Sequence, residues 1–465
     1  DLALGDSGTD LGVAYSLTQV DIHADQTLTL SESGLLDAQL TSSSGAGNLT
    51  IAASGNITLT NRLNAYTGDT TVDAGGALTA AAGALGQTDD LVVSGSFTNT
   101  GANEVKRLTV ADSGALTLNG SLTIAHAGYG ATDAASTIAG ALDGSGGITL
   151  ESGKLTVTEN KETDYSGGVG LGSGTVLELV GVNALSSGSV NFADAGSSQL
   201  SISDSGNAAF SNALTGGIGT ITVSLTGSDS EFSFATNQSG LATGSKLVLD
   251  GAIFDLTSTD ANNNDDVAQK LIVRVETGST LTNDGLANKT LSGLELAGGT
   301  VDLGGLNGEH GQIGLNGGKL VIEGSNTIVL DSQAQVSESG DRNIGDGSDL
   351  LSGGLFELDI FTNVGDLSGS VTGLHTDSNF SGTTENLLQN ADGDSELEHV
   401  ANMTRDSGSF IYDDDLNKVY LQYSLKEIEL LWTVDDQGLL VDAGGATGAG
   451  TPLLSARITG KGNLR

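Results

Sequence analysis

A short phrase of alternating aliphatic residues on both sides of a glycine recurs through most of this chain. Around Gly55 it reads LTIAASGNITL. The phrase is repeated at Gly34, Gly55, Gly114, Gly153, Gly251 and Gly318. Alternation with a period of two on either side of a glycine is typical of two short strands joined by a tight bend. A repeat of near-constant length predicts a stack of similar coils, a β-solenoid, rather than a closed sandwich.

The spacing of the glycines predicts how successive coils align. The intervals are 21, 21, 19 and 19 residues between Gly34, Gly55, Gly76, Gly95 and Gly114. We therefore expect these glycines to lie above one another, and we interpret the 39 residues from Gly114 to Gly153 as two coils. Residues 160–247 keep the alternation but lose the count, so no register is predicted there. A chain of this length would hold roughly twenty such coils.

Composition agrees with a narrow, strand-lined interior. Hydrophobic residues make up 37% of the chain but aromatic residues only 4%, and 70 glycines accompany a single proline. Proline would remove a ladder hydrogen bond wherever a coil is paired on both sides. There are no cysteines, which excludes disulfides and thiolate metal sites. No long apolar run and no signal peptide occur, and this does not decide between an exported and a cytoplasmic protein.

The formal net charge of −41 limits the choice of partners. A strongly acidic surface repels nucleic acids and anionic membranes, so we expect neither a nucleic-acid partner nor direct membrane insertion. The simplest role of this charge is to keep a strand-rich protein soluble. A docking surface for basic protein modules is the alternative.

Two stretches, Asn64–Gly86 and Asp164–Phe192, share a more specific pattern. In each, a tyrosine followed by Thr-Gly or Ser-Gly precedes a glycine-turned strand pair, and a small-residue ALG or ALSSG sequence closes the unit. This pattern resembles the passenger-associated repeat of AIDA-type autotransporter adhesins. The resemblance implies an all-β fold, a right-handed parallel β-helix with three strands per turn. It also implies display on a bacterial cell surface through a C-terminal translocator that is absent from this chain.

Adhesion is the function that the resemblance implies. The expected partners are host glycosaminoglycans and extracellular-matrix proteins such as fibronectin. Possible self-association in biofilms is one alternative, and a polysaccharide lyase or hydrolase is another. Because neither motifs nor ligand spacings indicate otherwise, we expect no enzyme activity, no cofactor and no metal.

The C-terminal part of the chain departs from the repeat. We predict a β-helix body over residues 1–404 and a C-terminal cap over residues 405–465. Phe410–Ser424 reads as a hairpin with an Asp-rich turn, and Glu429–Gly445 reads as a second hairpin that carries Trp432. Residues 338–350 and 376–408 lack the repeat and are predicted to be irregular.

A candidate glycan-binding groove is predicted beside an over-long coil. The interval from Gly251 to Gly278 is 27 residues, and its excess lies in the segment TDANNNDD. Four basic residues upstream of successive turns are expected to share one flank and to form a locally basic groove; the alternative is isolated lysines that serve solubility. The candidate residues are Lys246, Lys270, Arg274 and Lys289, bounded by Asp260, Asn262, Asn263, Asn264 and Asp265.

A second candidate surface is an acidic ladder downstream, suited to an elongated protein partner by charge steering. Its residues are Asp302, Glu323, Asp341, Asp346 and Asp349. Solvated turns and flanks are the simpler interpretation of these residues.

Catalytic and metal-binding interpretations are weaker. The sequence GDSGTD around Ser7 is similar to a serine-protease motif, but the histidine and aspartate that such chemistry needs have no room upstream. The histidines are dispersed without ligand spacing. Calcium ligands are plentiful in Asn390–Glu396 and Asp413–Asp415, but neither segment has the spacing of a known calcium loop, and both read as solvated turns.

Overall fold

The computed structural model describes residues 2–4, 11–13, 17–126, 134–159, 163–193, 197–236, 238–256, 267–283, 288–304, 311–330, 355–377, 384–389, 398–405, 408–431, 438–439, 457–460 and 463–464. The chain is all-β and forms a parallel β-solenoid of about 12 turns, which confirms the predicted fold class. It contains two compact units. Unit 1 comprises Asp1–Ser205, Ala209–Thr222 and Gln238–Ala242, and unit 2 comprises Gly206–Ala208, Val223–Asn237 and Thr243–Arg465. The expectation of roughly twenty coils was too high, because the C-terminal strands do not coil.

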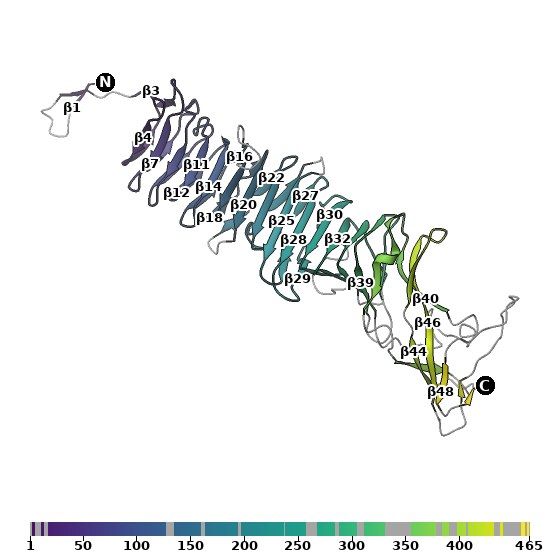
Figure 1. The fold of residues 1–465 in the computed structure, drawn as a ribbon. Coiled ribbons are helices and arrows are strands. Elements are labelled where there is room, and N and C mark those ends of the chain that lie inside the picture. Colours follow the sequence, from purple (N-terminus) through teal and green to yellow (C-terminus); the bar gives the residue numbers. More distant parts are fainter. Residues whose placement is uncertain are drawn as a thin grey trace. The chain divides into compact units, whose positions relative to one another are not determined.

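Three parallel sheets form the sides of unit 1, and each coil contributes at most one strand to each sheet (Figure 1). The first sheet contains β4 (Thr27–Leu30), β7 (Asn48–Ile51), β9 (Thr70–Val72), β11 (Asp90–Val93), β14 (Arg107–Val110), β17 (Ala135–Ile138), β20 (Lys154–Thr158), β23 (Val176–Val180) and β25 (Gln199–Asp204). The second sheet contains β5 (Ser33–Leu36), β8 (Asn56–Leu59), β10 (Ala77–Ala80), β12 (Ser96–Asn99), β15 (Ala115–Leu118), β18 (Ala141–Gly144) and β21 (Asp164–Tyr165). The third sheet contains β13 (Asn103–Val105), β16 (Leu122–Ile124), β19 (Ile148–Leu150), β22 (Gly168–Leu171), β24 (Ser189–Phe192) and β27 (Leu214–Gly216).

Short additional strands complete this unit. β3 (Gln19–Asp21) pairs in parallel with β6 (Gln39–Thr41), and β1 (Leu2–Leu4) pairs antiparallel with β2 (Leu11–Val13). β26 (Ala208–Phe210) and β28 (Thr220–Leu225) each include residues of both units.

The alternation seen in the sequence becomes an inside and an outside. In β7, β10, β11, β14 and β15, every second residue is buried and its neighbours are partly exposed. Inward residues such as Leu49, Leu78 and Leu116 have 0 to 1% of their surface exposed. Burial of these aliphatic columns on one side and hydration of polar residues on the other therefore fixes the face of every strand.

A column of glycines marks the corner before the second sheet. Gly55, Gly76, Gly95 and Gly114 align as predicted, since the residues that follow them pair as Asn56 with Ala77, Ala77 with Ser96, and Ser96 with Ala115. A Cβ atom on Gly55 would lie 2.6 Å from the carbonyl oxygen of Leu30, and one on Gly76 would lie 2.7 Å from that of Ala52. Glycine is required here because the backbone of the previous coil occupies the space of a side chain.

Two glycine alignments were wrong. Gly34 lies within β5 and pairs with Ile57, so it stands outside the column. The glycine in register with Gly114 is Gly140, because Ala115 pairs with Ala141; Gly153 instead precedes β20 of the first sheet. Residues 115–140 are therefore one long coil. An insertion at one corner changes the sequence interval without changing the strand register, and for that reason spacing alone misplaced Gly153.

Residues 160–247, for which no register was predicted, also stack strand upon strand. Leu155 pairs with Leu177 and Leu177 pairs with Leu200 in the first sheet. In the third sheet, Val169 pairs with Val190 and Val190 pairs with Leu214. The strands align although the connecting turns vary in length.

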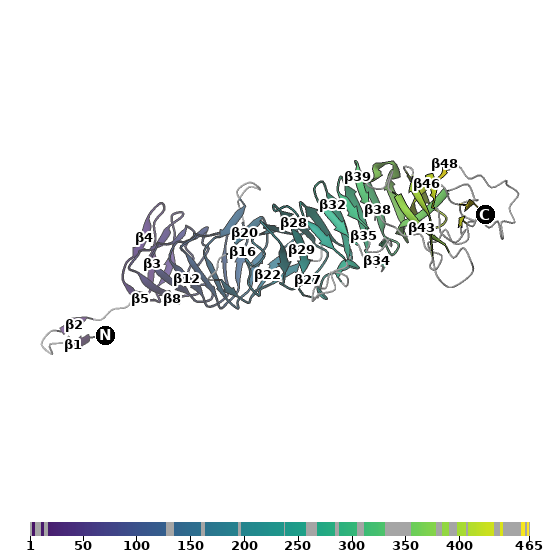
Figure 2. The same cartoon turned by 90° about the horizontal axis from the view of Figure 1, so that it is seen from below.

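Unit 2 repeats the arrangement with three sheets of its own. The first contains β30 (Ser245–Asp250), β32 (Leu271–Glu276), β35 (Gly293–Ala297), β38 (Lys319–Glu323) and β41 (Asp366–Gly369). The second contains β29 (Glu231–Phe234), β31 (Ile253–Asp255), β33 (Thr280–Thr282), β36 (Thr300–Asp302), β39 (Asn326–Val329) and β42 (Leu374–Thr376). The third begins with β34 (Asn288–Thr290) and β37 (Gln312–Gly314), and a 3-10 helix (Val371–Gly373) precedes β42. Figure 2 shows β32, β35 and β38 side by side.

The third sheet of unit 2 changes from parallel to antiparallel pairing. β40 (Leu355–Thr362) pairs in parallel with β37 but antiparallel with the long strand β46 (Lys418–Leu430). β45 (Ser409–Asp413) forms the predicted antiparallel hairpin with β46, and β48 (Arg457–Gly460) pairs in parallel with β46. Bonds between strands of both directions thus close the last parallel edge of this sheet, which is the physical task of a cap.

The cap differs from the sequence-based prediction in three ways. Its antiparallel pairing begins at β40, well before residue 405, and the last parallel strand of the coils ends at Thr376. Residues 376–408, predicted to be irregular, contain the antiparallel pair β43 (Thr384–Gln389) and β44 (Glu398–Arg405). The expected second hairpin is replaced by parallel pairing of β47 (Gly438–Leu439) with β49 (Asn463–Leu464). Trp432 and residues 338–350 lie outside the described residues.

Among the described residues, no helix has the length and apolar character needed to cross a membrane.

Candidate binding surfaces

Two residues of the predicted basic groove meet on the first sheet of unit 2. Arg274 of β32 pairs with Val248 of β30, and Lys246 lies two residues before Val248 on the same face. On the other side, Arg274 pairs with Glu295 of β35. The register therefore brings both cations to one flank, but it places a carboxylate in the same column.

Ion pairs consume the positive charge of this flank. Lys246 Nζ lies 2.6 Å from Glu295 Oε2. Arg274 binds three carboxylates, with Nε 2.5 Å from Glu276 Oε1, Nη1 3.1 Å from Glu295 Oε2 and Nη2 2.9 Å from Glu323 Oε2. Two cations facing three carboxylates give a formal charge of −1. The predicted locally basic groove is thus wrong for these two residues, since Glu295 and Glu323 come from strands that the spacing analysis did not align.

The other predicted groove residues do not complete it. Lys289 lies in β34 of the third sheet, and Lys270 directly precedes β32 of the first sheet. Lys289 and Arg274 thus belong to different sheets. The bounding residues Asp260, Asn262, Asn263, Asn264 and Asp265 lie outside the described residues.

Stability at the ion-pair cluster should depend on pH through Glu295. Partial burial raises the pKa of Glu295, but hydrogen bonds from Lys246 and Arg274 outweigh it and hold this pKa below the ordinary value of 4.5. A carboxyl group with a lowered pKa stabilises the folded state above its ordinary pKa, and this contribution is lost as the pH falls through the lowered value. We expect Glu295→Gln to lower the free energy of unfolding by about 1 kcal/mol at pH 7.

Urea unfolding of both proteins between pH 7 and pH 3 checks this expectation. The difference between the proteins should shrink toward zero as the pH falls below the lowered pKa. Glu231→Gln is the matched control, because Glu231 is exposed and belongs to the second sheet. A difference that does not change with pH would contradict the assignment.

The predicted acidic ladder is not a single surface in the part of the chain that the structure describes. Asp302 belongs to β36 of the second sheet, whereas Glu323 belongs to β38 of the first sheet and binds Arg274. Asp341, Asp346 and Asp349 lie outside the described residues. Alternation placed each residue on the exterior, but it did not reveal on which of three sides.

Sequence reasoning missed a column of threonines on the second sheet of unit 1. Thr58, Thr79, Thr98 and Thr117 pair directly, each with the next, on β8, β10, β12 and β15. All four side chains are partly exposed. A signal for this column exists in the sequence, because the threonines are separated by 21, 19 and 19 residues, as are the glycines of the adjacent corner.

The two repeat-like stretches have related conformations. Tyr66 and Tyr165 are fully buried, and so are the Ala-Leu pairs that close the stretches at Ala84 and Ala184. The hydroxyl of Tyr66 lies 2.8 Å from Thr70 Oγ1, and that of Tyr165 donates to the carbonyl oxygen of Gly168 at 2.9 Å. Burial raises the pKa of both tyrosines, so both hydroxyls stay protonated. The shared sequence pattern therefore encodes a shared piece of structure, a tyrosine packed inside a widened corner.

The described residues that combine acids and bases form mutually satisfied pairs. Asp90 is bonded to Arg107, and Asp89 to Lys106. Burial and the charge of Asp90 raise the pKa of nearby Asp69. Cleavage of a polysaccharide requires an acid and a second carboxylate on opposite sides of a bound sugar. Here the carboxylates of Asp89 and Asp90 are occupied by cations, an arrangement that favours a structural role.

The histidine and serine candidates are equally unsuited to nucleophilic chemistry. His126 is 3% exposed, with Nδ1 2.6 Å from the carbonyl oxygen of Ser152 and Nε2 3.0 Å from Ser136 Oγ. Burial lowers the pKa of His126, which keeps the ring neutral. Ser136 is completely buried and accepts the amide proton of Leu108, so a substrate has no access to it. Ser7 lies outside the described residues.

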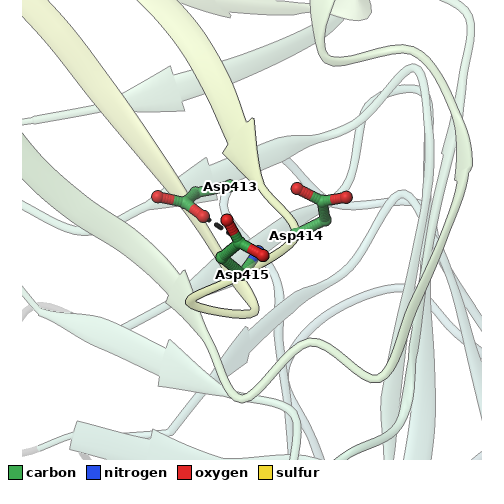
Figure 3. A group of neighbouring side chains, drawn as sticks. All are labelled: Asp413, Asp414 and Asp415. Atoms are coloured by element: carbon green, nitrogen blue, oxygen red, sulfur yellow. Dashed lines mark hydrogen bonds between the residues drawn. The ribbon is translucent and has the colours of Figure 1, made fainter.

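Three aspartates gather in the turn between β45 and β46 (Figure 3). Asp413 Oδ1 accepts the amide protons of Asp415 and Leu416, both at 3.0 Å, and Asp414 and Asp415 are exposed. These bonds are typical of an Asx turn, in which an aspartate stabilises a tight bend. The cluster fits the expected solvated turn. Residues 390–396, the other acidic segment, lie almost wholly outside the described residues.

No family model, no curated protein and no solved structure matches this chain.

Proposed function

We propose that this chain is the passenger of an autotransporter-type adhesin, displayed on a bacterial cell surface, which binds glycans or extracellular-matrix proteins without catalysis. The observation that carries the proposal is the pair of tyrosine-centred corners at Tyr66 and Tyr165 within one solenoid. They give a structural basis to the repeat pattern that resembles autotransporter passengers. The antiparallel cap on the last parallel edge is consistent with the same type of protein.

The choice of ligand follows from the charge of the surface. Glycosaminoglycans are anionic, and the cations expected to bind them at Lys246 and Arg274 are occupied by three carboxylates. With a net charge of −41, an anionic polymer would be repelled at the low salt where electrostatic binding is strongest. The charge balance therefore favours uncharged glycans and basic segments of matrix proteins such as fibronectin over glycosaminoglycans.

Binding arrays test this function. The chain, labelled at one added cysteine, is applied to neutral glycans, glycosaminoglycans, fibronectin and other matrix proteins at physiological salt. We expect binding to neutral glycans or matrix proteins and no shortening of any polysaccharide on prolonged incubation. Absence of binding to the whole array would refute the adhesin, and chain shortening would establish the lyase or hydrolase instead.

Self-association is the second candidate function. Leu17, Leu35 and Leu63 are 61%, 68% and 66% exposed, which is unusual for leucine on an acidic, soluble surface. Sedimentation velocity over a hundredfold range of concentration distinguishes the cases, because a host adhesin stays monomeric. A dimer that dissociates in Leu35→Ser would favour self-association.

A further inference from the structure

The threonine column forms part of a larger uncharged face. The outward positions of β8, β10, β12 and β15 carry two parallel columns, since the residue two before each threonine also faces outward. The members of this threonine face are Asn56, Thr58, Ala77, Thr79, Ser96, Thr98, Ala115 and Thr117. None is charged, although the whole chain carries 75 charged residues besides histidine (58 acidic and 17 basic).

The hydroxyl groups of the face are available to a ligand. None of the four threonine side chains hydrogen-bonds to another group in the part of the chain that the structure describes. By contrast, Thr156 on the first sheet donates to Glu178 Oε2 at 2.8 Å. Parallel pairing without register shifts repeats the hydroxyls at the strand separation of about 4.8 Å. The face thus offers unpaired donors and acceptors at a constant interval.

The ends of the threonine column differ in character. At one end, Leu35 of β5 pairs with Thr58 and is 68% exposed. At the other, Thr117 pairs with Asp143, and Asp143 pairs with Asp164. An apolar side chain thus begins the column and two carboxylates end it, so an anionic ligand would be repelled at the acidic end.

We propose that the threonine face binds an uncharged, linear polysaccharide that lies along the stack of strands. This inference rests on the proposed adhesin function and names its ligand class and its site. A neutral glycan offers hydroxyls at repeating intervals, which match a repeating row of donors and acceptors, and it pays no electrostatic penalty near an acidic protein. The threonine methyl groups and Leu35 supply the apolar contacts that a sugar ring needs on its non-polar face.

The affinity of such a face depends on the length of the ligand. A single sugar reaches one or two strands, and the gain is offset by the entropy lost on binding. A polymer that spans all four strands adds contacts without repeating that loss, so affinity rises with chain length. We therefore expect weak binding to disaccharides and measurable binding to long polymers.

The test compares isosteric variants on two sides of unit 1. Thr79→Val/Thr98→Val removes two hydroxyls from the face and keeps their shape and strand preference. Thr123→Val/Thr149→Val is the matched control, because these threonines pair directly on the third sheet. Affinity electrophoresis in gels containing hydroxyethyl cellulose, galactomannan or soluble starch measures binding to neutral polymers, and immobilised fibronectin measures binding to matrix protein. Circular dichroism and thermal midpoints verify that all variants are folded.

The expected result is retardation by at least one neutral polymer, weakened tenfold or more in Thr79→Val/Thr98→Val and unchanged in the control pair. Equal binding by both variants would overturn the assignment of the face. Lack of binding to every neutral polymer would also overturn it, while retained binding to fibronectin would leave the adhesin function standing. The two proposals therefore fail separately.

Discussion

Gly95→Ala should lower the free energy of unfolding of unit 1 by about 3 kcal/mol, the upper part of the range for overpacked sites. An added Cβ would lie within 3.0 Å of the carbonyl oxygens of Gly76 and Asp73. The carbonyl of Gly76 also accepts the amide proton of Ser96 at 2.9 Å, so the methyl group would separate two coils at their hydrogen-bonded corner. Backbone atoms cannot move aside as a flexible side chain would.

Gly34→Ala is the control for this prediction. Gly34 occupies the same position in its sequence phrase, but a Cβ there would meet nothing within 4 Å. We expect a change of no more than about 0.5 kcal/mol, as for surface substitutions. Urea unfolding followed by circular dichroism measures both variants, with limited proteolysis to locate the loosened coil. Equal destabilisation of the two variants would contradict the glycine column.

Phe254→Ala should lower the free energy of unfolding of unit 2 by about 4 kcal/mol, within the range for phenylalanine truncated in a core. Phe254 is fully buried and pairs across the coils with Phe232. Its ring centroid lies 6.3 Å from that of Phe232 and 6.1 Å from that of Phe234, the latter in an edge-to-face arrangement with an interplanar angle of 88°. Truncation would remove both contacts and leave a cavity that the regular backbone ladder cannot close.

Val248→Ala provides the matched control. Val248 lies on β30 and faces outward, so its truncation creates no cavity. We expect a change below about 1 kcal/mol, and Phe254→Leu should fall between the two because it fills part of the space. Thermal and urea midpoints give the order of the variants. An effect of Phe254→Ala as small as that of Val248→Ala would show that the three rings do not form a tight core.

The two stability predictions bear on function through the exterior of the coils. In a solenoid each coil contacts only its neighbours, so damage at Gly95 should spread to the strands directly above and below it. β12 carries Ser96 and Thr98 of the threonine face and begins immediately after Gly95. Loss of glycan binding in Gly95→Ala would therefore reflect lost register, which is why the isosteric threonine variants, and not the glycine variant, test the binding proposal.

Local sequence determined the type of fold and most of its strands. Alternating aliphatic residues place one face of every strand in the interior, and a glycine precedes a corner where the previous coil's backbone comes too close for a Cβ atom. Both signals depend on residues near one another in the chain. The same holds for the hairpin of β45 and β46, whose aromatic strands flank a turn built by Asp413. The resemblance to autotransporter adhesins and the function it implies stay predictions.

Only the tertiary structure decided which exterior residues share a surface. Arg274 meets Glu323, 49 residues away, because two intervening turns of the first sheet happen to align them. Insertions at corners change sequence intervals without changing strand register, so spacing misplaced Gly153 and joined Lys289 to a flank it does not occupy. Burial penalties fix whether a side chain faces in or out, but they are nearly indifferent to which of three outer sides it lies on. That choice comes from the hydrogen-bonded ladder, whose partners lie a full coil apart.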